Sequence, residues 1–148
     1  MRTLTWHVFI CAALVLGACG SAGADERDHG CTSRTLRGTY VFSATGFNIV
    51  AGVAQPKAIV EVIHFNGDGT LSVPSATLSA NGVIIRSLPG GFGTYTVEDD
   101  CTGTIAFSGP AFDAVLSRDG DTISMIQTNP GTVFQGTAAR QPRERDRF

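Results

Sequence analysis

From Gly38 onward the chain consists of short runs in which apolar and polar residues alternate. In the first run, residues 38–46, Tyr40, Phe42 and Ala44 share one face, because successive side chains of a strand point to opposite sides. Clusters of Gly, Asn, Asp and Pro separate the runs, as tight turns require. The main clusters are residues 66–69, 81–82, 118–121 and 129–131. The pattern predicts eight or nine strands and contains no segment with helical periodicity.

Residues 91–107 form the clearest predicted hairpin. Tyr95, Ile105 and Phe107 fall on its apolar face, and Thr and Glu residues occupy the other. Its turn contains Cys101 among residues that tolerate left-handed backbone angles. The cysteine can therefore connect this hairpin to a distant part of the chain.

Short turns between consecutive strands predict an antiparallel meander. Pairing of the last run, residues 132–140, with residues 38–46 would close the sheet and remove both edges. We therefore expect an all-β fold, a single antiparallel up-and-down β-barrel of about eight strands, rather than a sandwich. Pro74 predicts a bulge or an edge position, and residues 47–57 are expected to be a connection.

The first residues have the features of an export signal. A positive charge at Arg2 precedes an apolar run too short to span a bilayer, and residues 16–19 (LGAC) resemble a bacterial lipobox. This predicts a lipoprotein signal peptide over residues 1–18 and lipidation of Cys19; cleavage after residues 22–24 (AGA) is the alternative. The remaining expected parts are a flexible tether over 19–37, the barrel domain over 38–140 and a charged tail over 141–148.

Composition limits the functional classes. The 148 residues suffice for one domain, and the net charge of -2 provides no basic face for nucleic acid. Once a leader containing Cys11 is removed and Cys19 carries lipid, Cys31 and Cys101 remain as a pair, and an oxidising compartment favours a disulfide between them. The expected location is the periplasm or the outer membrane, with the lipid anchor as the only membrane contact.

The stretch from Cys31 to Arg140 resembles a family of small secreted bacterial β-proteins of unknown function. The matching segments are LRGTYVFSATG, HFNGDGTLS, GTYTVEDDCTGTIAF, FDAVLSRDGDTIS and TNPGTVFQGTAAR. The resemblance implies a calycin-like barrel, similar to lipocalins or to the allene oxide cyclase barrel. It transfers no catalytic residue, because none of these segments matches an enzyme motif.

Residues 58–65 (AIVEVIHF) carry the most informative ionisable groups. One face of this run bears Glu61 with Ile59, Ile63 and Phe65, and the other bears His64. Because Ile59, Ile63 and Phe65 are on the same face, Glu61 is favoured as the group that points inward. A buried carboxyl group would have a raised pKa and could act as an acid or anchor a ligand, or else pair with an arginine such as Arg86.

Other chemistry has weaker support. The aspartates of the turns fit tight reversals better than calcium loops, since no bidentate glutamate follows at the required offset. No nucleophile elbow, phosphate loop or metal-ligand spacing is present, so no cofactor, metal or catalytic residue is predicted.

The sequence thus favours an exported barrel that binds a small apolar ligand. The residues expected to line its interior site are Tyr40, Phe42, Glu61, Tyr95, Phe107 and Phe112. Two alternatives stay open: a cyclase or isomerase that uses the same cavity, and an envelope structural or interaction protein whose interior is filled.

Overall fold

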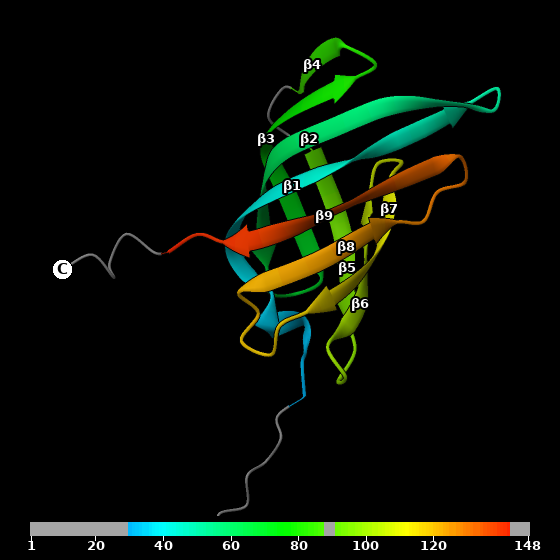
Figure 1. Cartoon of the computed structure of the whole chain (residues 1–148). Helices are drawn as coiled ribbons and strands as arrows, with labels where there is room; N and C mark the ends of the chain where they lie inside the picture. The colour runs from blue at the N-terminus through cyan, green and yellow to red at the C-terminus, as the bar shows by residue number, and fades with distance from the viewer. Residues whose placement is uncertain (1–29, 88–90, 143–148) are drawn as a thin grey trace, which may run out of the picture.

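The structure, a computed structural model, describes residues 30–87 and 91–142. The described residues form one 3-10 helix and nine strands (Figure 1). In chain order these are η1 (Ser33–Thr35), β1 (Arg37–Val50), β2 (Val53–Asn66), β3 (Thr70–Ala80), β4 (Val83–Ser87), β5 (Gly91–Val97), β6 (Thr102–Phe107), β7 (Ala111–Leu116), β8 (Thr122–Gln127) and β9 (Thr132–Arg140). The predicted leader, the lipidation site Cys19 and most of the charged tail lie outside the described residues.

Eight of the strands form a closed antiparallel ring. The ring runs β1-β2-β3-β5-β6-β7-β8-β9 and returns to β1. It is closed by β9, whose residues pair with β1 from Tyr40–Arg140 to Asn48–Thr132. The predicted up-and-down barrel and the predicted closing pair of strands are therefore confirmed.

The ninth strand, β4, lies outside the ring. Two strands share one edge of β3: residues 70–73 pair with β5, and residues 76–80 pair with β4. Pro74 stands between the two segments, and the β2 partner shifts register there, between Val62 and His64. The predicted bulge at Pro74 is thus observed, and it is the point at which β3 changes partner.

Residues 47–57 are not a connection, contrary to the prediction. They continue β1 and begin β2, so the two strands form a hairpin that extends beyond the ring (Figure 1). Ala51 and Gly52 make its turn with φ of 50° and 79°, a backbone geometry usually signalled by Asn-Gly. Pro56 is tolerated because β3 ends opposite Lys57, so its missing N–H interrupts no strand ladder; its carbonyl accepts from the amide of Asn81, in the turn that follows β3, at 2.8 Å.

The interior confirms the predicted apolar face. The residues predicted to face inward that are buried are Tyr40, Phe42, Ala44, Tyr95, Ile105 and Phe112, and Phe107 packs against them. The aromatic rings form two groups. Phe65 makes edge-to-face contacts with Tyr40 and Tyr95, each with ring centroids 5.1 Å apart, whereas the second group surrounds Phe112.

One end of the barrel is closed by the segment that precedes β1. Cys31 forms the predicted disulfide with Cys101, and its amide donates to the Asp99 carbonyl at 3.0 Å. Cys101 has a φ of 68°, so the cysteine itself takes the left-handed position of the turn. The side chain of Leu36 is fully buried in the core. Residues 31–36 are therefore folded, although they were expected to belong to a flexible tether.

The hydroxyl of Tyr95 connects this segment to the barrel. It donates toward the carbonyls of Ser33 and Leu36, each at 2.9 Å, and accepts from the Gly67 amide at 3.0 Å. The same group therefore satisfies backbone atoms of the N-terminal segment and of the β2–β3 turn, which would otherwise be left partly buried without partners.

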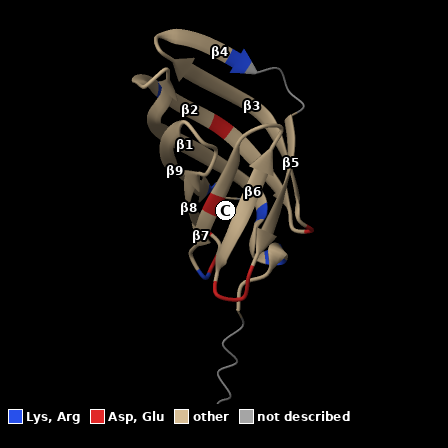
Figure 2. Ribbon diagram, turned by 90° about the vertical axis from the view of Figure 1, so that its right-hand side faces the viewer, with Lys and Arg blue, Asp and Glu red and all other residues tan. Residues whose placement is uncertain are grey.

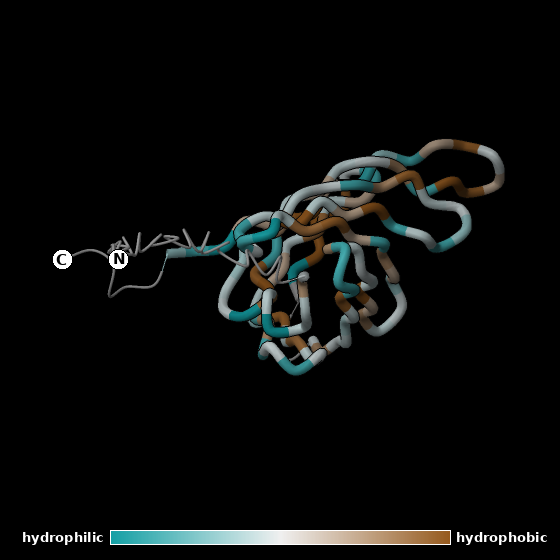
Figure 3. The backbone as a smooth tube through the Cα atoms, turned by 90° about the horizontal axis from the view of Figure 1, so that it is seen from below, coloured by the Kyte–Doolittle hydropathy of each residue, from teal (hydrophilic) through white to brown (hydrophobic). Residues whose placement is uncertain are grey.

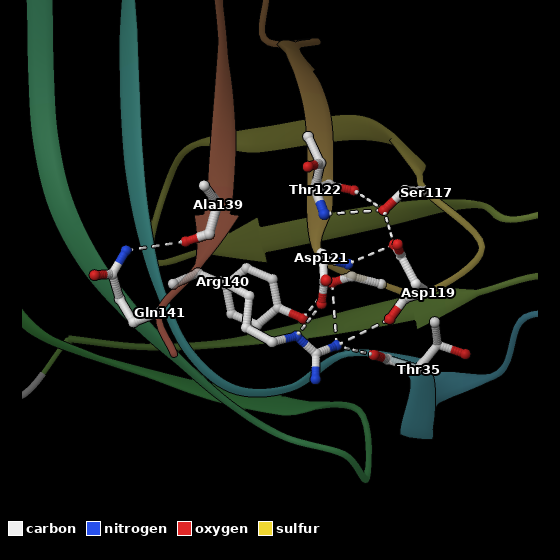
Figure 4. Close-up of polar contacts among 10 residues, drawn as sticks. Thr35, Ser117, Asp119, Asp121, Thr122, Ala139, Arg140 and Gln141 are labelled. Carbon is white, nitrogen blue, oxygen red and sulfur yellow. Dashed lines mark hydrogen bonds and ion pairs between the residues drawn. The ribbon is translucent and has the colours of Figure 1, made fainter. Parts of the chain in front are cut away.

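Arg140, the last residue of β9, makes a second connection at this end (Figure 4). Its Nη2 donates to the carbonyls of Thr35 at 2.8 Å and Gly120 at 3.1 Å, and its guanidinium lies over the Tyr40 ring. Nε lies 3.1 Å from Asp121 Oδ1, but the angle does not suit a hydrogen bond, so this contact is an ion pair. The final strand is thereby tied to the helix η1 and to the β7–β8 turn.

The aspartates at the closed end make tight turns, as predicted. Asp68 accepts from the amide and hydroxyl of Thr70, and Asp100 accepts from the same two groups of Thr102. These hydrogen bonds stabilise the carboxylate forms and lower the pKa values of both aspartates.

Candidate ligand-binding site

A cavity of about 280 Å³ occupies the opposite, open end of the barrel. Apolar side chains from six strands of the ring make up most of its wall: Phe42, Ile59, Val73, Phe107, Phe112 and Phe134. The alternation of each strand brings these residues inward, since strand side chains repeat with a period of two. The closed half of the interior is filled with side chains, and the open half retains this space.

Phe112 is at the centre of the aromatic wall. Its ring centroid lies 5.9 Å from those of Phe42 and Phe107, both edge-to-face, and 6.5 Å from that of Phe134. Edge-to-face rings hold one another in fixed orientations. The wall is therefore a preformed apolar surface.

Glu61 brings a carboxyl group into this cavity. It lies on the inward face of β2, between Phe42 of β1 and Ala76 of β3, and its residue is only 9% exposed. No described residue gives its carboxyl group a hydrogen bond or an ion pair; Arg86, the partner considered from the sequence, is an exposed residue of β4 outside the ring. Burial penalises the charged form and raises the pKa of Glu61 from 4.5 to about 7.

His64, the other ionisable group of the run, points outward and is exposed. Its Nδ1 lies 3.2 Å from the hydroxyl of Thr39, its neighbour across the β1–β2 pair. The preference for Glu61 as the inward group is therefore correct, and His64 has no place in the cavity.

Lys57 is a lining residue that the sequence analysis did not identify. Its Nζ donates to Gln127 Oε1 at 3.0 Å and lies 4.1 Å from the centre of the Phe134 ring. Partial burial lowers the pKa of its amine. Lys57 and Glu61 both face inward from β2. The alternation that would have shown this was not extended to Lys57, because residues 47–57 were expected to be a connection.

The structure separates the predicted site residues into two groups. Phe42, Glu61, Phe107 and Phe112 line the cavity together. Tyr40 and Tyr95, which were expected in the same lining, lie instead at the closed end. Their hydroxyls are bonded there to backbone carbonyls, of Gly120 for Tyr40 and of Ser33 and Leu36 for Tyr95. Alternation fixed the inward face of these tyrosines but not their height along the barrel.

Other features of the described residues offer less chemistry. A larger hollow, of about 910 Å³, lies on the outer wall over β5 to β9, where Thr96, Asp113 and Ser124 are among its exposed lining residues. Among residues 30–87 and 91–142, no three His, Cys, Asp or Glu side chains converge as metal ligands. That same part of the chain contains no helix with the length and hydropathy needed to cross a membrane.

The chain was also compared with known proteins. Neither a protein-family model nor a curated protein matches the sequence. Function is therefore inferred from the cavity, an apolar, aromatic wall onto which one carboxyl group of the described residues, that of Glu61, opens.

Proposed function

We propose that this protein is an exported envelope barrel that binds a small apolar ligand in the open-end cavity, with Glu61 contacting the ligand's one polar group. A calycin-like relationship and a lipid anchor at Cys19 belong to the same proposal. The observation that carries it is the Glu61 carboxyl group: the residue is only 9% exposed, it lines the cavity, and no described residue bonds to its carboxyl group.

A carboxyl group in this position is costly for a protein that has no use for it. Burial of a polar group without a hydrogen bond costs roughly 1–3 kcal/mol in proteins, and a charged group costs more. A ligand hydroxyl, amine or amide N–H would remove that cost when it bonds to Glu61. The surrounding phenylalanines would cover the remainder of the molecule.

The size of the cavity restricts the ligand. Its volume of about 280 Å³ falls near the lower limit of known ligand pockets, about 300 Å³. We therefore expect a molecule with no more than three aromatic rings, or a short acyl chain, carrying one hydrogen-bond donor.

Uptake of the fluorescent amine N-phenyl-1-naphthylamine tests the proposal. The variant Ile59→Trp fills the cavity and should abolish saturable uptake. Val60→Trp is the matched control, because Val60 is the next residue of β2 and is 56% exposed on the outer face. Equal uptake by both variants would contradict the proposal.

The role of Glu61 is tested with a pair of probes. The amine probe carries an N–H donor, and 2-phenylnaphthalene is a similar hydrocarbon without one. At pH 8, where Glu61 is charged, the protein should prefer the amine by roughly tenfold, as expected for a hydrogen bond to a charged group. Glu61→Leu should remove this preference while uptake of the hydrocarbon persists; Glu98→Leu, at an exposed glutamate, is the control.

A second candidate function is an isomerase or cyclase that uses the same cavity. It is favoured by the pKa of Glu61, about 7, because a group that titrates near the working pH can both take and give a proton. Mass spectrometry of ligand carried by the native protein separates the two functions. An enzyme with Glu61→Gln would retain a different molecule from the one that the unmodified protein retains, whereas a binding protein would retain the same one.

A further inference from the structure

The open end of the barrel also bears most of the large apolar residues that are exposed in the described chain. The β1–β2 hairpin extends beyond the ring and ends in Ile49, Val50 and Val53, and Figure 3 shows hydrophobic positions at its tip. The outer strand β4 adds Val83, Ile84 and Ile85, each more than half exposed. At the mouth of the cavity, Phe92 is 68% exposed.

These residues expose both faces of their strands. Val83, Ile84 and Ile85 are consecutive, and neighbouring side chains of a strand point to opposite sides. Ile49 and Val50 repeat this arrangement on β1. A protein partner that packs flat against the strand would cover only one of the two faces. Insertion into an apolar medium would cover both.

The charges of the barrel are distributed unevenly between its ends. The aspartates of the turns, at positions 68, 99, 100, 119 and 121, belong to the closed end, and Figure 2 shows acidic turns there. The segments at the open end, residues 46–60, 74–87, 91–93, 107–112 and 127–134, contain no Asp or Glu. Their only charged residues are Lys57 and Arg86. An anionic surface would therefore meet no carboxylate on these segments, because Glu61 lies inside the cavity and is only 9% exposed.

We propose that the open end of the barrel docks onto the surface of a bilayer that contains anionic phospholipid. The two hairpin tips would enter the interfacial region, and Arg86 would contact lipid phosphates. Within the described residues β4 pairs only with β3, so its free edge keeps backbone groups that need water or headgroups. That edge limits insertion to the interfacial depth. This contact is additional to the lipid anchor expected at Cys19 and does not depend on ligand binding.

Flotation with lipid vesicles tests this docking. The chain from Gly20 onward, which lacks Cys19 and keeps every described residue, is mixed with vesicles of phosphatidylcholine alone or with phosphatidylglycerol added. It should float with the anionic vesicles and bind the zwitterionic ones several-fold more weakly. Arg86→Gln should reduce the difference between the two vesicle types.

Paired variants locate the contact. Val83→Ser combined with Ile84→Ser removes one apolar group from each face of β4 and should weaken anionic-vesicle binding roughly tenfold or more. The matched control combines Val115→Ser with Ile126→Ser. These two residues are 59% and 51% exposed on the barrel wall outside the open-end segments, and their loss should leave flotation unchanged.

Three outcomes would overturn the docking proposal. The first is the absence of flotation with either vesicle type, and the second is an equal loss in the two paired variants. The third is a dimer that forms without lipid and is lost in the β4 variant, which would make a second copy of the chain the occupant of this end. Glu61→Leu should not affect flotation, so failure of the docking and failure of ligand binding are distinguishable.

Discussion

Glu61 and Lys57 share the inward face of β2 but do not pair with each other. They are four positions apart along the strand, which corresponds to about 13 Å. The Lys57 amine is bonded to Gln127 and lies over Phe134, and the Glu61 carboxyl group has no partner among the described residues. The cavity therefore holds two ionisable groups at different depths, and only the amine is bonded to another side chain.

The first prediction concerns the pH dependence of stability. The pKa of Glu61 is about 7 in the folded protein and near 4.5 when the group is solvated, so folding favours the protonated form between these values. The preference of the fold for the protonated group therefore stabilises the folded state fully below pH 4.5. This stabilisation, on the order of 3 kcal/mol in total, is lost as the pH rises through 7. Glu61→Gln should remove this decline and unfold at a higher urea concentration than the unmodified protein at pH 8.

Comparison with Glu98→Gln controls for a general effect of charge, because Glu98 is exposed. If the free energies of unfolding of the protein and of Glu61→Gln change in parallel between pH 4.5 and pH 8, the carboxyl group is not buried alone.

The disulfide supports the second prediction. Cys31 and Cys101 are 70 residues apart, and closing a loop of that length stabilises a fold by about 4 kcal/mol in the chain-entropy model. The double variant Cys31→Ser, Cys101→Ser should therefore have a free energy of unfolding lower by about that amount, measured by urea denaturation. A loss well below 1 kcal/mol would show that the closed end does not depend on the bond.

The third prediction compares two buried tyrosine hydroxyls. Tyr95→Phe removes the hydrogen bonds that the hydroxyl makes to the Gly67 amide and to the Leu36 carbonyl, and should cost about 1–3 kcal/mol. Tyr40→Phe should cost about 1 kcal/mol or less, because the Gly120 carbonyl keeps its bond from Arg140. The order of the two melting temperatures checks this, and a lower value for Tyr40→Phe would contradict it.

The fourth prediction concerns the last strand. Arg140→Met removes the hydrogen bonds to Thr35 and Gly120 and the ion pair with Asp121, at a cost of about 2 kcal/mol. Arg86→Met, at an exposed arginine of β4, should change stability little. Amide hydrogen exchange should accelerate at the closed end of β9 in the first variant only. If exchange there is unchanged, the backbone hydrogen bonds of β9 to β1 and β8 account for its stability without Arg140.

Alternation and turn chemistry predicted most of the fold from the sequence. They identified the inward face of Tyr40 and Phe42, the hairpin around Cys101 and the closure of β9 on β1, because each depends on local spacing or on turn residues. The Ala51-Gly52 turn was missed because it lacks the usual asparagine. That omission also concealed the length of β1 and β2.

The candidate site was predictable only in part, for a related reason. Period-two alternation assigns Glu61 and Phe112 to the interior but does not say at which height they lie. Height depends on the stagger between strands, which placed Tyr95 at the closed end and Lys57 at the cavity. Neither stagger nor residual volume is encoded in the local pattern.

The central claim, that the open half of the barrel is a ligand site, is tested most directly by methyl NMR during titration with N-phenyl-1-naphthylamine. The methyl groups of Ile59, Val73 and Leu78 line the cavity, and those of Leu36, Ile105 and Ile123 are buried in the core outside its lining. We expect saturable shifts in the first group and constant positions in the second. Shifts confined to the outer-wall residues Val60 and Val115, or no saturable shift in any methyl group, would contradict the account.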